Sequence, residues 1–223
     1  MVPIVTYIYF ASGVIPILAY STLKVKKSIP SRFVFAFLIL SVSIDFHNFY
    51  CYLNKENNLV LVNIYDYVAI FLELFFFLSI TKFNKAFTFL TSIVLLLCWT
   101  AHIIFNVNNG FQLYSPSLSY MMSLIVCIYS VIVTLIIIRE DTLNFNRSKH
   151  QLIAILGFFL FESLCLIPVS TLNLDLNTSD REHLAELYNL IVVLGGVLRN
   201  IIFTLYFIAE RRKRTCYNDL KTI

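Results

Sequence analysis

The hydrophobic positions of this chain gather into seven apolar stretches, which short polar segments separate. Each stretch holds about 20 residues, enough for a helix to cross the roughly 30 Å hydrocarbon core of a bilayer at about 1.5 Å of rise per residue. The pattern therefore predicts a bundle of seven membrane-spanning helices, over Val2–Leu23, Arg32–Leu53, Leu59–Ile80, Phe87–Phe105, Leu113–Ile138, Gln151–Val169 and Tyr188–Ile208.

Composition supports this all-α membrane fold. Hydrophobic residues make up 59% of the 223 residues and charged residues 13%, whereas a soluble domain has about 45–50% and about 25%. We expect one membrane domain over residues 1–223, with a basic tail at 209–223. A bundle of six membrane-spanning helices would require that the more polar second or third stretch does not insert into the membrane. The flanking residues of both stretches argue against that. The first stretch lacks a basic start and a small-residue cleavage site, so it is typical of a retained helix.

The basic residues predict the orientation. Fourteen of the 17 Lys and Arg residues lie on one side of the predicted bundle, while the opposite side has only Lys55 and Arg181, and Arg199 lies within the last stretch. The positive-inside rule then places the N-terminus outside and the C-terminus in the cytoplasm. We expect the membrane to be the inner membrane of a bacterium. This topology accounts for the net charge of +4. We therefore expect no nucleic-acid partner and expect the basic tail to meet anionic lipid.

Charged residues inside apolar stretches are the most informative feature of the sequence. A charge at the bilayer centre costs roughly 2.5–3.5 kcal/mol, and helical spacing puts Ser41, Asp45 and Asn48 on one face of the second helix. We expect an outward-opening polar cavity between the second, third, sixth and seventh helices. Its candidate ligand- or ion-binding residues are Asp45, Asn48, Asp66, Glu73, Glu162 and Arg199.

The depths of these residues predict one ion pair. Glu73 and Arg199 both lie near the middle of the membrane, and four acids face this single Arg. Some of the acids must then be protonated, bind a cation or contact water. Two alternatives stay open: the charges only hold the bundle together, or Asp66 extends to the membrane surface.

Matching offsets indicate an internal repeat. Asp45 follows Ser31 by fourteen residues, and Glu162 follows Ser148 by the same number. This spacing favours two three-helix units in parallel orientation, joined by the fourth helix. Because serines and basic residues commonly flank membrane helices, a chance match is the alternative.

The last helix is predicted to begin outside the membrane. Ser179–Glu182 has the capping-box pattern, in which a serine starts a helix and a glutamate three residues later bonds back to it. Further along, Gly195 and Gly196 allow a neighbouring backbone or a ligand to approach closely.

The known catalytic motifs are absent from the sequence. It has no HExxH, Gly-rich phosphate loop or GxSxG, and no lysine in the last stretch for a retinal Schiff base. His47 and His102 lack the spacing of a metal site, so we expect no cofactor and no metal, and the sequence favours a protein that is not an enzyme without excluding enzyme activity. The five cysteines fit small apolar positions, with a Cys51–Cys98 disulfide as the alternative.

The chain resembles small bacterial seven-helix membrane proteins of unassigned function. The likeness rests on Asn63-Ile64-Tyr65 followed by Glu73, and on Leu198-Arg199-Asn200 before Phe203 and the basic tail. The resemblance implies the fold and a membrane location, and no activity.

The leading functional hypothesis is a carrier of a small polar or cationic solute, or of protons, in which the acids accept the cation and Arg199 acts as counter-ion. The main alternative is a receptor or regulatory subunit that signals through a separate cytoplasmic partner. A structural bundle with paired charges, or an intramembrane lipid enzyme that uses His47 or His102, would also fit. A second copy of the chain or another membrane protein stays open as a partner.

Overall fold

The computed structural model describes residues 2–23, 27–109, 116–140, 145–171 and 178–219. In this part of the chain all regular structure is helical, which confirms the all-α prediction. The seven helices are α1 (Val2–Ser21), α2 (Ile29–Asn54), α3 (Leu59–Ile80), α4 (Lys85–Asn109), α5 (Pro116–Glu140), α6 (Phe145–Thr171) and α7 (Thr178–Asp219).

The helices are those of a multi-pass membrane protein. Among the described residues, five helices are long and apolar enough to cross a membrane, and these lie in α2, α3, α4, α5 and α7. The described apolar parts of the other two helices are shorter, at Tyr7–Ser21 in α1 and His150–Leu166 in α6.

The helix α7 is much longer than its predicted span. It covers 42 residues and begins at Thr178, before the apolar part, so it extends beyond the predicted span as expected. The side chains of the capping-box residues Ser179–Glu182 lie outside the described ones. At its other end the helix continues to Asp219, through most of the segment predicted as a tail. Charged residues of high helix propensity, such as Glu210 and Arg211, extend it there.

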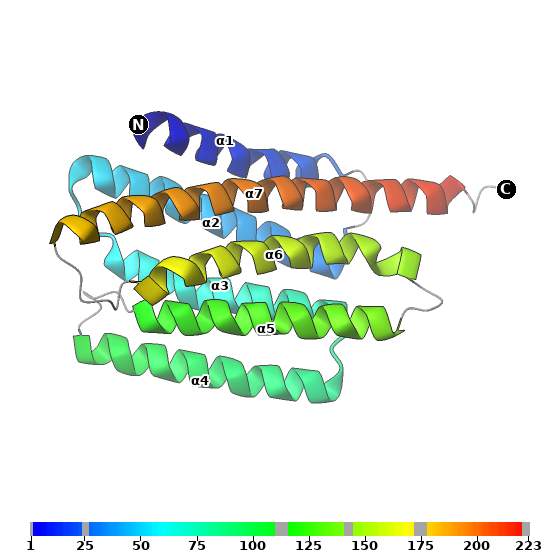
Figure 1. The fold of residues 1–223 in the computed structure, drawn as a ribbon. Coiled ribbons are helices and arrows are strands. Elements are labelled where there is room, and N and C mark those ends of the chain that lie inside the picture. The colour runs from blue at the N-terminus through cyan, green and yellow to red at the C-terminus, as the bar shows by residue number, and fades with distance from the viewer. Residues whose placement is uncertain (1, 24–26, 110–115, 141–144, 172–177, 220–223) are drawn as a thin grey trace.

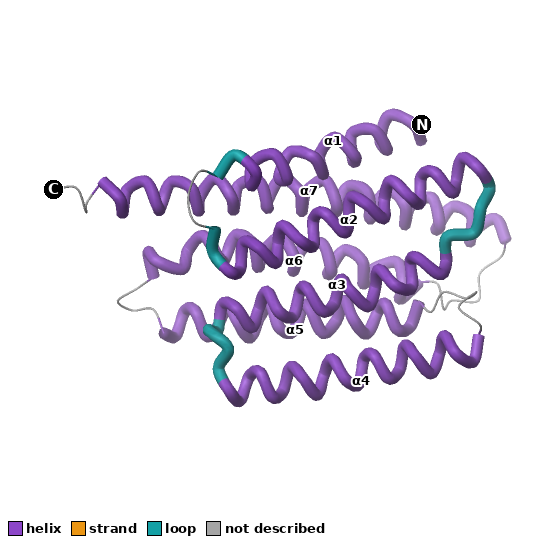
Figure 2. The backbone as a smooth tube through the Cα atoms, turned by 180° about the vertical axis from the view of Figure 1, so that it is seen from behind, coloured by secondary structure: helices purple, strands orange, loops and turns teal. Residues whose placement is uncertain are grey.

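Six of the helices close into a ring. In order around the ring, α1 packs on α2, α2 on α3, α3 on α5, α5 on α6, α6 on α7, and α7 on α1. The helix α4 lies outside this ring against α3 and α5, as the views from both sides show (Figures 1 and 2). Its outer side chains are exposed, for example Phe89 at 70% and Val107 at 66%. Such a surface suits lipid, which solvates apolar side chains.

One half of the ring interior is packed with aromatic rings. We call this region the aromatic half, and its side chains are all 1% exposed or less: Phe37, Phe76, Phe77, Phe158 and Phe203. The centroid of the Phe158 ring lies 5.2 Å from that of Phe37, 5.1 Å from Phe76 and 4.9 Å from Phe203. These tilted and edge-to-face contacts are the favoured geometries of aromatic pairs.

Candidate functional site

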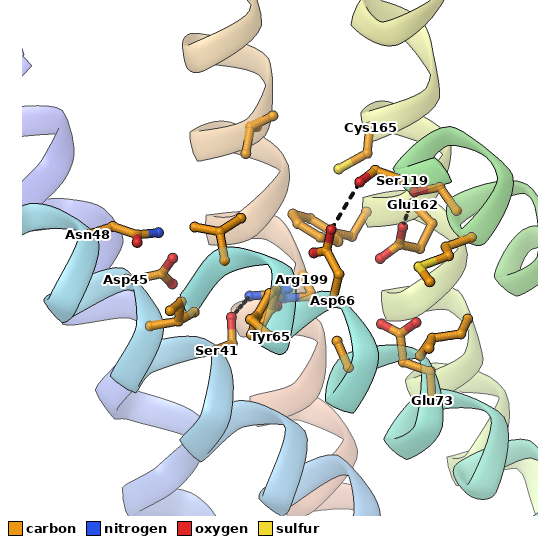
Figure 3. Close-up of a pocket in the computed structure, with 18 of the residues that line it drawn as sticks. Ser41, Asp45, Asn48, Tyr65, Asp66, Glu73, Ser119, Glu162, Cys165 and Arg199 are labelled. Carbon is orange, nitrogen blue, oxygen red and sulfur yellow. Dashed lines mark hydrogen bonds between the residues drawn. The ribbon is translucent and has the colours of Figure 1, made fainter. Parts of the chain in front are cut away.

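The other half of the ring interior contains a polar cavity of about 290 Å³. All six helices of the ring contribute to it, and α4 contributes no lining residue. The lining comes from the middle and second half of α2, from α3 up to Glu73, from the start of α5 and from the later part of α6, so the cavity lies toward the end of the bundle where α2 joins α3. We call this region the polar half (Figure 3).

Every candidate residue named from the sequence lines this one cavity. Asp45 and Asn48 come from α2, Asp66 and Glu73 from α3, Glu162 from α6 and Arg199 from α7. The predicted face of α2 is confirmed, because Ser41 lines the cavity with Asp45 and Asn48. Asp66 lines the cavity too, and its Oδ2 accepts a hydrogen bond from Ser119 of α5. Asn48 also closes the α2–α3 turn, since its Oδ1 accepts a 2.8 Å hydrogen bond from Asn58 Nδ2.

Three of the four carboxyl groups accept a hydrogen bond from a neutral hydroxyl on another helix. Asp45 accepts from Tyr9 of α1 at 2.7 Å. Asp66 and Glu162 accept from two serines of α5, Ser119 at 3.0 Å and Ser123 at 2.6 Å. A hydroxyl satisfies one lone pair of a carboxylate and leaves its charge uncompensated.

Glu73 is placed differently from the other acids. Its side chain is only 4% exposed, and it makes no hydrogen bond with any residue drawn in Figure 3. It interacts electrostatically with both Glu162 and Arg199. An acid buried in this way is costly unless a proton, a cation or water meets it.

Arg199 is almost fully buried, at 2% exposure. Its Nη2 donates a 3.0 Å hydrogen bond to Ser41 Oγ, whereas its Nε and Nη1 have no hydrogen-bond partner among the described residues. The guanidinium carbon lies 4.1 Å from the ring centroid of Phe161 and 5.1 Å from that of Phe37. These distances are typical of cation–π contacts.

The predicted ion pair between Glu73 and Arg199 is therefore wrong as a direct contact. Two of the three guanidinium nitrogens, Nε and Nη1, have no hydrogen-bond partner in the described part of the protein, and the third, Nη2, donates to Ser41. Similar depth in the membrane did not bring the two groups together, because contact also depends on how each helix is rotated about its axis.

The two glycines of α7 are closely packed, but against side chains of other helices and not against the neighbouring backbone that the sequence predicted as one alternative. A Cβ at Gly196 would lie 2.3 Å from Tyr9 Cε2, so only glycine leaves room for the tyrosine ring that bonds Asp45. At Gly195 the nearest atom would be Leu164 Cδ1 at 3.1 Å, the end of a flexible side chain.

Sequence reasoning missed the contributions of α1 and α5. Tyr9, Ser119 and Ser123 carry all three hydroxyls that bond the acids. The only available signal was the spacing of Ser119 and Ser123, four residues apart on one helical face. That signal is weak, because serines in membrane helices often bond their own backbone.

Among the described residues, Cys165 lines the cavity, whereas His47, His102, Cys51 and Cys98 lie away from its lining. The ring of His47 contacts Cys51 at 3.3 Å, and that of His102 packs against Tyr67. Within the described residues no group of three or more His, Cys, Asp or Glu side chains is arranged to hold a metal ion. Cys51 and Cys98 are both free thiols, so the alternative of a disulfide between them is wrong.

No protein-family model, no curated protein and no solved structure matches this chain. The likeness to small bacterial seven-helix proteins stays a prediction, and the chemistry of the cavity is the basis for any function.

Proposed function

We propose that this protein is a seven-span membrane carrier that binds a small cationic solute in the cavity of the polar half. One observation carries the proposal: four carboxyl groups and one guanidinium line the same cavity, and none of these acids is hydrogen-bonded by Arg199. If all five are ionised, the lining has an excess of three negative charges. Charge of this kind within a membrane marks substrate and ion pathways, and a bound cation or proton would compensate it.

The ring supports seven spans. The helix α1 packs between α2 and α7, and α6 packs between α5 and α7. Their ring neighbours α2, α5 and α7 contain helices long and apolar enough to cross a membrane. A helix held between spanning neighbours shares their environment, so we place α1 and α6 in the membrane as well. The basic residues then orient the C-terminus to the cytoplasm.

The order of helices supports a carrier. The order of the helices around the ring has a two-fold symmetry. It stays the same when α1, α2 and α3 are exchanged with α5, α6 and α7, respectively, and α4 is the connection outside the ring. The hydroxyl pairs follow the same exchange, because α1 donates to Asp45 of α2 and α5 donates to Glu162 of α6. Two parallel three-helix units around a central site are an arrangement used by secondary transporters.

The test measures thermal stability of the purified protein against a panel of alkali cations and short alkylammonium ions. A ligand that binds only the folded state raises the Tm, by an amount that grows with its concentration. We expect at least one cation to stabilise the wild type and to lose this effect in Glu73→Gln. The matched control is Glu56→Gln, in the exposed α2–α3 turn, which should keep the full shift.

Two results would overturn the proposal. One is a wild-type protein whose Tm no cation in the panel changes. The other is a shift that persists in full in the Glu73→Gln and Glu162→Gln double variant. For a cation that passes the first test, uptake into proteoliposomes then separates a carrier from a receptor, because only a carrier accumulates it inside.

A further inference from the structure

The guanidinium of Arg199 has more hydrogen-bond donors than the protein satisfies. An arginine carries five N–H groups, one on Nε and two on each terminal nitrogen. Nε and Nη1 are buried without a partner in the described part of the chain, so at least three of the five donors have no protein acceptor. Ser41 meets only the Nη2 nitrogen.

Packing alone does not account for this arrangement. The rings of Phe161 and Phe37 contact the guanidinium carbon, and an aromatic ring interacts with the charge without accepting the in-plane N–H groups as a carboxylate does. Three of the four carboxyl groups of the same cavity are hydrogen-bonded elsewhere, to Tyr9, Ser119 and Ser123, and the fourth, that of Glu73, accepts no hydrogen bond from Arg199. The donors of Arg199 therefore suit an acceptor that enters from outside the protein.

The cavity has a positive pole at Arg199 and a negative pole at Glu73 and Glu162. Figure 3 shows Arg199 between Asp45 on one side and Asp66, Glu73 and Glu162 on the other. Glu73 and Glu162 interact electrostatically with each other, so a positive group is favoured beside them. A planar anion is favoured at Arg199, because a carboxylate matches the fork of N–H donors.

We infer that the solute is a small zwitterion, with an ammonium group at the Glu73 and Glu162 pole and a carboxylate at Arg199. This inference rests on the proposed function and narrows it from cations in general to amino-acid-like molecules. The cavity of about 290 Å³ suits a solute with few carbon atoms, since sites for drug-sized ligands are about 300–1,000 Å³.

The test compares pairs of molecules that differ only in the anionic group. The probes are glycine, β-alanine and γ-aminobutyrate, each measured against the alkylamine that has a methyl group in place of the carboxylate. We expect at least one zwitterion to bind the purified wild-type protein about tenfold or more tightly than its alkylamine, as a charged hydrogen bond gives. Calorimetry and the ligand-dependent Tm both report the affinity.

Variants of Arg199 then locate the carboxylate. Arg199→Gln should abolish the preference, so that the zwitterion binds no more tightly than its alkylamine. Arg199→Lys, which keeps the charge but lacks the planar fork, should reduce the preference and guards against a folding defect in the first variant. The matched control Arg139→Gln removes an exposed arginine that lies outside the cavity lining and should bind like the wild type.

The outcomes separate this inference from the proposed function. The inference of a zwitterionic solute is overturned if alkylamines bind and no zwitterion binds more tightly, or if the preference persists in both Arg199 variants. The proposed cation site is then still supported. If neither class of probe binds and no simple cation does, both fail together.

Discussion

The polar half and the aromatic half are built by the same helices, yet one is hollow and the other is closely packed. On each of four helices, a residue of the cavity lining and a ring of the aromatic half lie about one turn apart. These pairs are Ser41 and Phe37, Glu73 and Phe77, Glu162 and Phe158, and Arg199 and Phe203. Backbone geometry is therefore not what opens the cavity. Side-chain chemistry decides it, because rings interlock while carboxyl groups that need solvation resist close packing.

This difference assigns a separate task to each half. The aromatic half holds the helices together through fully buried rings that pack against one another. The polar half gains little stability from its hydroxyl–carboxyl contacts, since polar contacts between membrane helices average only about 0.6 kcal/mol. Substitutions in the two halves should then separate stability from binding.

The largest effect is expected in the aromatic half. Phe158→Ala removes a fully buried ring that contacts four others, and it should lower the free energy of unfolding by about 3–5 kcal/mol, as cavity formation does in other cores. Equilibrium unfolding in detergent micelles measures the change. Phe89→Ala on the outer face of α4, where the ring is 70% exposed, should change it by about 0.5 kcal/mol or less. Equal losses in the two variants would show that the aromatic half has no special role.

A smaller loss of stability is expected at the contact between α1 and α7 beside the cavity. Gly196→Ala places a methyl group against the Tyr9 ring, so the ring must move and its bond to Asp45 breaks. We expect a loss of about 1–3 kcal/mol, typical of overpacking. Gly195→Ala meets only the end of Leu164, and the gain in helix propensity should offset its cost. A Gly196→Ala protein as stable as Gly195→Ala would rule out a rigid contact at Tyr9.

The smallest effect is expected in the polar half. Ser123→Ala removes the hydrogen bond to Glu162 and should destabilise the protein by only about 0.6 kcal/mol. In Ser92→Ala the lost hydroxyl bonds its own helix, at Thr88 O, so this variant should be nearly neutral. A loss above about 2 kcal/mol for Ser123→Ala would show that the polar half also holds the bundle together.

The sequence predicted most of the fold because a membrane allows few alternatives. The predicted bounds of the third helix, Leu59–Ile80, are those of α3. The start of the seventh helix before its span at Tyr188–Ile208 was predicted, but its continuation after the span was not, because hydropathy reports only the apolar part of a helix. The polar continuation to Asp219 depends on helix propensity and was not visible in that pattern.

The site was predictable as far as its residues are costly in a membrane. Charges such as Asp45 and Arg199 stand out in apolar stretches, and all of the predicted ones line the cavity. Hydroxyl residues do not stand out, because Thr100 bonds its own helix at Leu96 O while Ser123 bonds Glu162. The sequence alone does not separate these two uses.

The length of α7 has a mechanical consequence. Its 42 residues form a rod of about 63 Å, roughly twice the thickness of the hydrocarbon core. This single lever carries Arg199 at the cavity and the exposed Arg211 and Arg212 further along. A tilt of a few degrees about the Gly196 contact moves both ends by a few ångström in opposite directions. A tilt that moves Arg199 only slightly, because it lies three residues from that contact, therefore moves the basic end much further.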